Sequence, residues 1–143
     1  MRDLLKIDII KNRLLNYFEN NEKVSTVYIF GSFGTENETA MSDIDIAILY
    51  DTPVSVYEES GYSGEISSLL LTDKVDTISL NSAPIYIQHE VLYTGVKIFE
   101  RAPRKTMDFV EGVLEMYHDY EIIFRKYREE YVAALKEEYQ GGR

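Results

Sequence analysis

Two apolar stretches separated by a polar gap decide the fold: Val27-Tyr28-Ile29-Phe30-Gly31-Ser32 and Asp43-Ile44-Asp45-Ile46-Ala47-Ile48-Leu49. Both are rich in branched and aromatic residues, which are typical of β-strands, so we predict strands over residues 24–30 and 44–50. Ten residues lie between Ser32 and Asp43. The gap therefore joins a glycine-serine turn at the end of one strand to a pair of carboxylates at the start of the next.

The spacing of the two aspartates predicts a metal site. Residues two apart in a strand face the same way, so Asp43 and Asp45 project together while Ile44, Ile46 and Ile48 face the core. A third strand predicted over residues 74–80 carries Asp76. If that strand lies beside residues 44–50, the three carboxylates form a triad that suits Mg²⁺, with two ions about 4 Å apart. Asp76 alone is also consistent with a strand-entry residue that pairs with Lys74 or Lys97.

The glycine-serine pair suits a phosphate group. Gly31 allows a sharp turn and a close approach of the backbone to a ligand, and we expect Ser32 to offer its hydroxyl and amide at a helix start. No lysine or arginine occurs between Gly31 and Asp51. Metal ions and backbone amides would therefore balance most of the charge of a triphosphate. Together the two halves predict metal-dependent chemistry on a nucleoside triphosphate.

The composition narrows the class of protein. The 143 residues suffice for about one domain. A net charge of -10 argues against a direct nucleic acid partner. The absence of cysteine excludes disulfides and thiolate chemistry. The start of the chain carries charges where a signal peptide needs an apolar stretch, and no apolar run approaches ~18 residues. We therefore expect a cytoplasmic protein without a membrane partner.

The remaining pattern predicts an α/β (α+β) fold, with a small mixed sheet and helices packed on one side. Residues 3–20 have the apolar spacing of an amphipathic helix. Residues 51–64 are predicted as a loop or a short irregular helix and 65–71 as a helix. The segment 82–84 opens a helix that Gly95 closes, and residues 96–100 form a short edge strand.

A long helical pattern runs from Thr106 to about Tyr139. One continuous helix would measure roughly 50 Å, whereas the radius of gyration of such a domain is only about 15 Å. We therefore expect a break near Gly112 or Asp119, or a part that reaches a partner. A tyrosine stripe on this helix fits either the domain's own sheet or a partner. The chain thus divides into a catalytic domain, 1–103, and a helical extension, 104–143, as a candidate partner-binding surface.

At this point the chain resembles a known family. Phe30-Gly31-Ser32, ten residues, Asp43-Ile44-Asp45 and then Val75-Asp76-Thr77-Ile78 are similar to the minimal nucleotidyltransferase (MNT) branch of the DNA polymerase beta-like superfamily. Residues 90–100 and 117–120 also resemble the C-terminal portion of that family. Its bacterial and archaeal members, of the MntA type, are commonly antitoxins paired with a HEPN-domain ribonuclease toxin.

The resemblance implies a function and a role for each matching residue. Gly31 and Ser32 would bind the triphosphate of ATP, and Asp43 and Asp45 would ligate Mg²⁺. Asp76 would be the third carboxylate and would draw the proton from the acceptor hydroxyl. The implied reaction is AMP transfer to a tyrosine of the HEPN toxin, which this chain would silence within a hetero-oligomer.

One departure from the family keeps two alternatives open. Many relatives carry an arginine directly after the glycine-serine pair, whereas this chain has Phe33-Gly34. The first alternative is therefore a catalytically weak antitoxin that acts by binding alone. The second is a nucleotidyltransferase for a small hydroxylated molecule such as an aminoglycoside, although such enzymes usually add a further domain.

Overall fold

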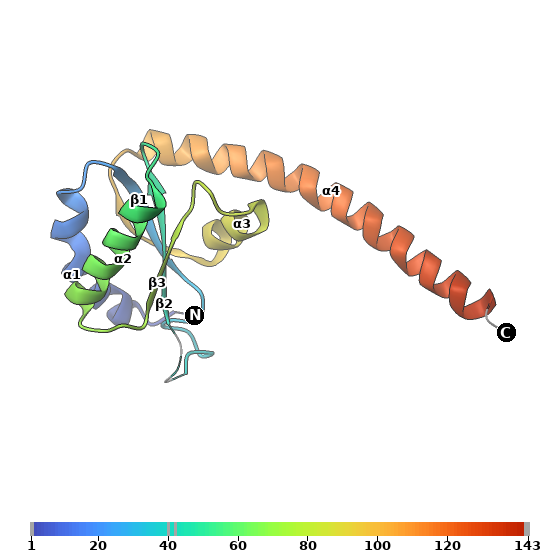
Figure 1. Ribbon diagram of the computed structural model, residues 1–143, viewed down its shortest axis with the longest axis horizontal. Coiled ribbons are helices and arrows are strands. Elements are labelled where there is room, and N and C mark those ends of the chain that lie inside the picture. The colour runs from blue at the N-terminus through green and yellow to red at the C-terminus, as the bar shows by residue number, and fades with distance from the viewer. Residues whose placement is uncertain (1, 40, 42, 142–143) are drawn as a thin grey trace.

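Four strands form one mixed sheet at the centre of the molecule (Figure 1). The computed structural model describes residues 2–39, 41 and 43–141. The strands are β1 (Val24–Phe30), β2 (Ile44–Tyr50), β3 (Val75–Ser79) and β4 (Val96–Glu100), in the order β3-β2-β1-β4. β1 is antiparallel to β2 and to β4, whereas β2 and β3 are parallel. The predicted mixed sheet and its edge strand over 96–100 are therefore confirmed.

Two helices cover the first face of the sheet, α1 (Leu4–Glu19) and α2 (Val56–Leu70). α1 buries one residue per turn against the sheet: Ile7, Ile10, Leu14 and Phe18. This spacing of three and four residues is the one that predicted the helix. Alternate residues of β2 complete this layer of the core, including Ile46 and Ile48. The isoleucines of the Asp-Ile-Asp stretch thus face the core, as predicted.

The prediction for residues 51–64 is wrong over most of its length, because α2 is one helix from Val56 to Leu70. Ser55 and Glu58 form a capping box that starts it, each side chain accepting a hydrogen bond from the other residue's backbone amide. Gly61 and Gly64 lower the helix propensity of the segment, and this masked the helix in the sequence. Burial of Ile66 and Leu70 against the sheet outweighs that penalty.

The second face of the sheet is also covered, by α3 (Ile85–Thr94) and the first turns of α4 (Pro103–Gly141). Val91 of α3 and Phe109 of α4 pack on Ala47 and Leu49 of β2. We expected all helices on one side of the sheet, whereas α1 and α2 cover one face and α3 and α4 cover the other. β1 and β2 are buried on both faces because they are the two inner strands, and each apolar face needs its own cover.

α3 begins and ends at the residues that the sequence predicted. Pro84 occupies the N-cap position and Gly95 the C-cap position. Gly95 also lies so close to the backbone carbonyl of Val91 that a β-carbon would overlap it. The glycine is therefore required by the tight passage from α3 into β4.

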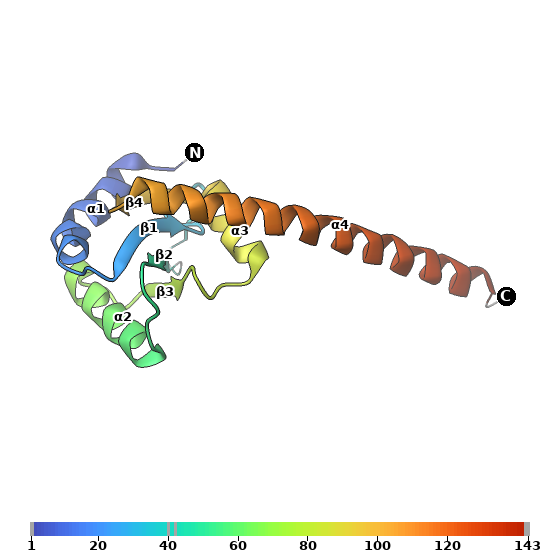
Figure 2. The same ribbon diagram turned by 90° about the horizontal axis from the view of Figure 1, so that it is seen from above.

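α4 is a single helix of 39 residues, so the first of the two expected alternatives, a break near Gly112 or Asp119, is wrong. At 1.5 Å per residue it is about 58 Å long. Figures 1 and 2 both show it crossing α3 and then extending far beyond the rest of the molecule. Gly112 faces open space, so no contact forces the chain to bend there. No helix in the described ranges is long and apolar enough to cross a membrane.

Candidate active site

The register of the sheet brings two of the predicted aspartates side by side. β2 pairs with β3 so that Asp45 lies opposite Asp76. Along their strands, Asp45 and Asp76 alternate with residues that face α1 and α2. Their side chains therefore lie on the opposite face of the sheet, which α3 covers further along the strands. Asp45 is half-buried, whereas Asp76 is exposed. Asp43 is exposed and immediately precedes β2.

The glycine-serine turn lies against the carboxylate of Asp45. Phe30, the last residue of β1, pairs with Asp45, so the turn that follows lies against the start of β2. Gly31 has a φ of +75°, which favours glycine. A β-carbon at Gly31 would overlap Oδ2 of Asp45 and lie 3.2 Å from its Cγ. Both the backbone conformation and the lack of space therefore require glycine here.

The segment after Gly31 is a turn and not the helix start that the sequence suggested for Ser32. The amide of Thr35 donates to the carbonyl of Ser32 (3.0 Å), and so does the Thr35 hydroxyl (2.6 Å). Gly34 also has a φ of +75°, which a right-handed helix cannot accommodate. The backbone therefore folds back on itself beside the carboxylates.

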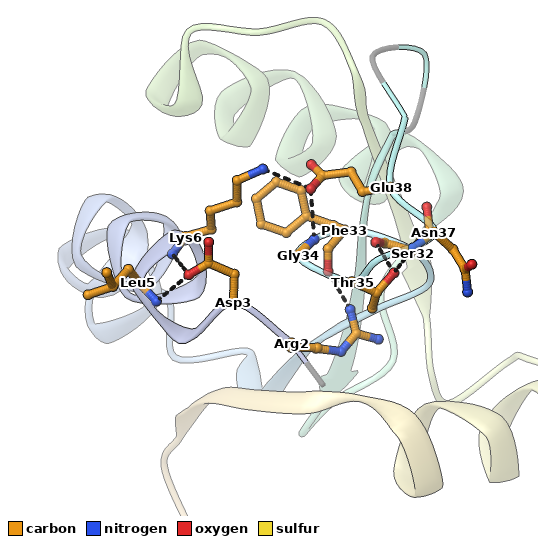
Figure 3. A network of polar contacts seen from close by, with 10 residues as sticks. All are labelled: Arg2, Asp3, Leu5, Lys6, Ser32, Phe33, Gly34, Thr35, Asn37 and Glu38. Carbon is orange, nitrogen blue, oxygen red and sulfur yellow. Dashed lines mark hydrogen bonds and ion pairs between the residues drawn. The ribbon is translucent and has the colours of Figure 1, made fainter.

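The N-terminal segment holds this turn in place, as Figure 3 shows. The guanidinium of Arg2 donates to the carbonyl of Gly31 (2.8 Å) and to that of Phe33 (2.6 Å). The amide of Asp3 donates to the carbonyl of Gly34 (2.6 Å). The ammonium of Lys6 pairs with Glu38 at 2.8 Å, and the same carboxylate accepts from the amide of Gly34 (3.2 Å).

Sequence reasoning missed Arg2 as a residue of the site. It lies 29 positions before Gly31, and only the folding of α1 onto the sheet brings the two together. The one signal in the sequence was indirect: the absence of any basic residue between Gly31 and Asp51 implied that a cation had to come from elsewhere.

The carboxylates repel one another at this end of the sheet. The pKa of Asp45 is raised, chiefly by burial and then by the nearby charges of Asp76 and Asp43, while Arg2 acts in the opposite direction. A divalent cation would remove this penalty, and aspartate oxygens are the ligands that Mg²⁺ prefers. Within the described ranges no three acidic or histidine side chains already form a closed metal cluster. The donor set thus fits Mg²⁺ bound by one or two carboxylates plus substrate phosphates.

Two hollows flank the turn and the carboxylates. One, of about 510 Å³, is lined by Asp45 and Asp76 on its polar side and by apolar residues that include Phe30 and Ile87. The other, of about 730 Å³, is lined by Arg2, Gly31 and Ser32, among other residues. Each volume is in the range of small-molecule sites. Gly31 lines one hollow and Asp45 the other, and these two residues lie against each other.

The other candidates from the sequence have structural roles. Lys97 pairs with Glu100 at 2.9 Å, so it is not the partner of Asp76. His89 stacks on Tyr117, with ring centroids 3.6 Å apart, and thereby joins α3 to α4.

This arrangement of a glycine turn against strand carboxylates is that of a nucleotidyltransferase, and comparison with known proteins agrees. Residues 12–104 match the family described as Polymerase beta, Nucleotidyltransferase, and the chain belongs to this family. The predicted resemblance, fold and enzyme class are thereby confirmed.

Two relatives whose names include an activity are similar to more than half of this chain. The chain is 35% identical over 82 residues to a putative protein adenylyltransferase of Methanocaldococcus jannaschii, which covers 57% of this chain and 83% of the relative. It is 32% identical over 96 residues to the protein adenylyltransferase MntA of Aphanizomenon flos-aquae, covering 60% of this chain and 63% of that protein.

Solved structures share the fold. One is described as the toxin-antitoxin MntA-HepT, with a TM-score of 0.69 at 21% identity over 87% of this chain and 98% of the other. A second, described as the toxin-antitoxin with AMP-PNP, has a TM-score of 0.72 at 21% identity over 85% and 98%. A third is a tri-AMPylated Shewanella oneidensis HEPN toxin in complex with MNT antitoxin, with a TM-score of 0.70 at 21% identity over 87% and 98%. At this identity the likeness concerns the fold.

Proposed function

We propose that this chain is a magnesium-dependent protein adenylyltransferase that transfers AMP from ATP to a tyrosine of a HEPN ribonuclease toxin and so acts as its antitoxin. The observation that carries the proposal is the contact between Gly31 and Asp45, with Asp76 opposite on the next strand. In this proposal the turn binds phosphate, and the carboxylate that touches it binds a cation. The names of the relatives and the AMP-PNP complex of a similar fold support it.

Each site residue has a role in this reaction. Gly31 and Ser32 bind the triphosphate through the turn. Asp43, Asp45 and Asp76 are the carboxylates that would hold two magnesium ions, with one or two of them at each ion and the substrate phosphates completing the ligands. When bound, the ions neutralise the triphosphate charge and polarise the phosphate that is transferred. Asp76 is exposed at the mouth of the site, where an incoming side chain can reach it.

The chemical step is a displacement at the α-phosphorus. The tyrosine oxygen forms a bond to that phosphorus, and the bond from it to the oxygen bridging to the β-phosphate breaks. Pyrophosphate leaves, and the phenolic proton passes to the carboxylate of Asp76. The step needs no oxidant or reductant, so ATP, Mg²⁺ and the acceptor tyrosine suffice.

A test of this function uses the purified chain, Mg²⁺, ATP labelled at the α-phosphate, and a helical protein of the HEPN class, to be sought among the products of the neighbouring genes. Label should reach a tyrosine of that protein, located by mass spectrometry. Asp43→Asn combined with Asp45→Asn should abolish the transfer. Asp73→Asn, an exposed aspartate before β3, is the matched control for loss of a negative charge.

Two results would count against the enzymatic reading. One is the absence of label on any partner. The other is a double asparagine variant that protects cells from the toxin as well as the unaltered chain does at normal expression. The second result would favour the antitoxin that acts by binding alone.

The toxin-binding surface of this proposal is the helical extension, residues 104–143, beside the catalytic domain 1–103. One face of α4 packs on the molecule near its start, where Val113 is buried and Tyr117 stacks on His89. The same face continues with apolar residues at alternating steps of three and four: Tyr120, Phe124, Tyr127, Tyr131 and Ala134. Such a spacing is that of a helix packed along another helix.

Beyond Phe124 this face has no cover within the described part of the chain. The side chains of Tyr127 and Tyr131 are 67% and 66% exposed. Tyrosine is enriched in protein interfaces because its ring supplies area while its hydroxyl stays hydrated. The occupant we assign is a helix of the toxin, since the spacing suits a helical partner and similar folds occur in toxin complexes.

Paired variants test this surface. Tyr127→Ser with Tyr131→Ser should weaken toxin binding at least about tenfold, as expected for aromatic anchors. Ile122→Ser is the control, because Ile122 is also half-exposed but lies nine residues, or half a turn of the helical wheel, from Tyr131. Calorimetry with the toxin should separate the two. Unchanged affinity for the toxin in the double variant would refute the assignment. Self-association that sedimentation detects and that depends on these tyrosines would show that the occupant of the surface is a second copy of this chain.

A further inference from the structure

Arg2 makes a set of contacts unlike those of the other basic side chains near the site. Its guanidinium donates to the carbonyl oxygens of Gly31, Phe33 and Thr94, the last at a longer 3.4 Å. All of these acceptors are neutral. Within the described residues no carboxylate lies at ion-pair distance from it, whereas Lys6 is paired with Glu38. Arg2 therefore has no ion-pair partner among the described residues, and the charge of Asp45 acts on it only from a greater distance.

That charge lies where the proposed substrate requires it. A nucleoside triphosphate is strongly anionic, the chain carries a net charge of -10, and residues 31–51 include no lysine or arginine. Arg2 lines the same hollow as Gly31 and Ser32. Its field also reaches Asp45. In a partly buried site a cation at this position attracts phosphate more strongly than one in bulk water would.

The contacts of Arg2 also orient the turn. In a trans peptide the carbonyl oxygen and the following amide hydrogen point in opposite directions. Because the guanidinium of Arg2 donates to the carbonyl of Gly31, this oxygen points toward Arg2, and the peptide between Gly31 and Ser32 is held in one orientation. Without this bond the carbonyl oxygen could rotate toward the ligand and repel a phosphate.

We infer that Arg2 is the positioning residue for the triphosphate: it fixes the peptide between Gly31 and Ser32 and adds the positive charge that this turn lacks. The inference rests on the proposed function, because it takes ATP as the ligand. It gives the charge-poor turn its cation from the N-terminal segment, whereas Phe33 packs against the core beneath α1 and beside Lys6.

The test compares nucleotides that differ in phosphate number, measured by calorimetry on the full chain with Mg²⁺. Arg2→Met should weaken ATP binding at least about tenfold and leave adenosine binding within twofold, since adenosine has no phosphate to position. Arg2→Lys should recover part of the ATP affinity, because it restores the positive charge but not the pair of hydrogen bonds to the carbonyls of Gly31 and Phe33. In a transfer assay Arg2→Met should raise KM for ATP more than it lowers kcat.

Two controls separate this role from a structural one. Lys11→Met removes one positive charge from an exposed position of α1 and should not alter ATP affinity. Lys6→Met removes the ion pair to Glu38 and loosens the same loop, yet should change ATP affinity less than Arg2→Met does. Thermal unfolding of each variant confirms that it is folded.

The outcomes distinguish this inference from the proposed function. ATP binding by Arg2→Met within twofold of the unaltered chain, or an equal loss for ATP and adenosine, would overturn the role of Arg2. An unaltered chain that binds ATP through Arg2 but labels no partner would overturn the transfer reaction alone. An unaltered chain that does not bind ATP would overturn both.

Discussion

Gly31 lies directly against the carboxylate of Asp45, so that a β-carbon on the glycine would overlap Oδ2 of the aspartate. The turn and the carboxylate belong to neighbouring strands, β1 and β2, and their contact results from the antiparallel pairing of Phe30 with Asp45. A phosphate bound at the turn and a cation bound at the carboxylate would therefore be adjacent. The geometry of the sheet alone produces this proximity.

The first prediction concerns Gly31→Ala. The methyl group must displace Asp45, and alanine must also adopt a positive φ, which alone costs about 1–2 kcal/mol. We expect loss of AMP transfer together with a drop of this size in the free energy of unfolding, measured by denaturant titration.

Gly61→Ala in α2 is the matched control for Gly31. A β-carbon there meets no atom within 4 Å, and alanine has the higher helix propensity. The control should keep full activity and gain up to about 1 kcal/mol in stability. Equal behaviour of the two alanine variants would show that the Gly31 contact does not matter.

The second prediction concerns pH in the absence of metal. The pKa of Asp45 is raised by burial first and by its acidic neighbours second, so the folded state binds this proton more tightly than the unfolded state does. Stability from this residue is therefore largest at low pH and falls as pH rises from the unfolded pKa, near 3.9, through the folded one. Asp45→Asn should remove this part of the dependence.

Thermal unfolding across pH 3 to 8 checks this, with and without Mg²⁺. At neutral pH without metal, Asp45→Asn should unfold at a higher temperature than the unaltered chain. Added Mg²⁺ should raise the unfolding temperature of the unaltered chain but not of the variant. An equal response of both proteins to Mg²⁺ would place the ion elsewhere.

Part of this site could be predicted from the sequence, because it depends on local patterns. Alternation along one strand places Asp45 and Ile46 on opposite faces, and a glycine after a strand implies a turn. Arg2 could not be predicted, since its contact with Gly31 depends on how α1 docks on the sheet. The helix over Val56–Leu70 was hidden for a different reason: its two glycines lower the local propensity, and the packing of Ile66 restores it only in the folded protein.

The third prediction concerns the attachment of α4 to the sheet. The hydroxyls of Thr26 in β1 and Thr106 in α4 are buried and lie 2.7 Å apart. Thr106→Val leaves the Thr26 hydroxyl without this partner, which should cost about 1–3 kcal/mol. The double variant with Thr26→Val should lose less than Thr106→Val alone, because both buried polar groups are then gone.

A double-mutant cycle by chemical denaturation measures this coupling. The loss of stability in the double variant should be smaller than the sum of the two single losses, because removing both hydroxyls leaves neither without its partner. Strictly additive losses would mean that the pair contributes nothing to holding α4 on β1.

The fourth prediction concerns the continuity of α4. Gly112 was an expected break, yet the helix runs through it and a β-carbon at this position would meet open space. Gly112→Ala should therefore stabilise the protein by about 0.5–1 kcal/mol, as alanine does at an exposed helix position. If the chain bent at Gly112 through a positive φ, the same substitution would destabilise it. Denaturant titration shows whether the free energy of unfolding rises or falls, and circular dichroism should show unchanged or increased helix content. A straight α4 then presents the tyrosine face beyond Phe124 as one rigid surface.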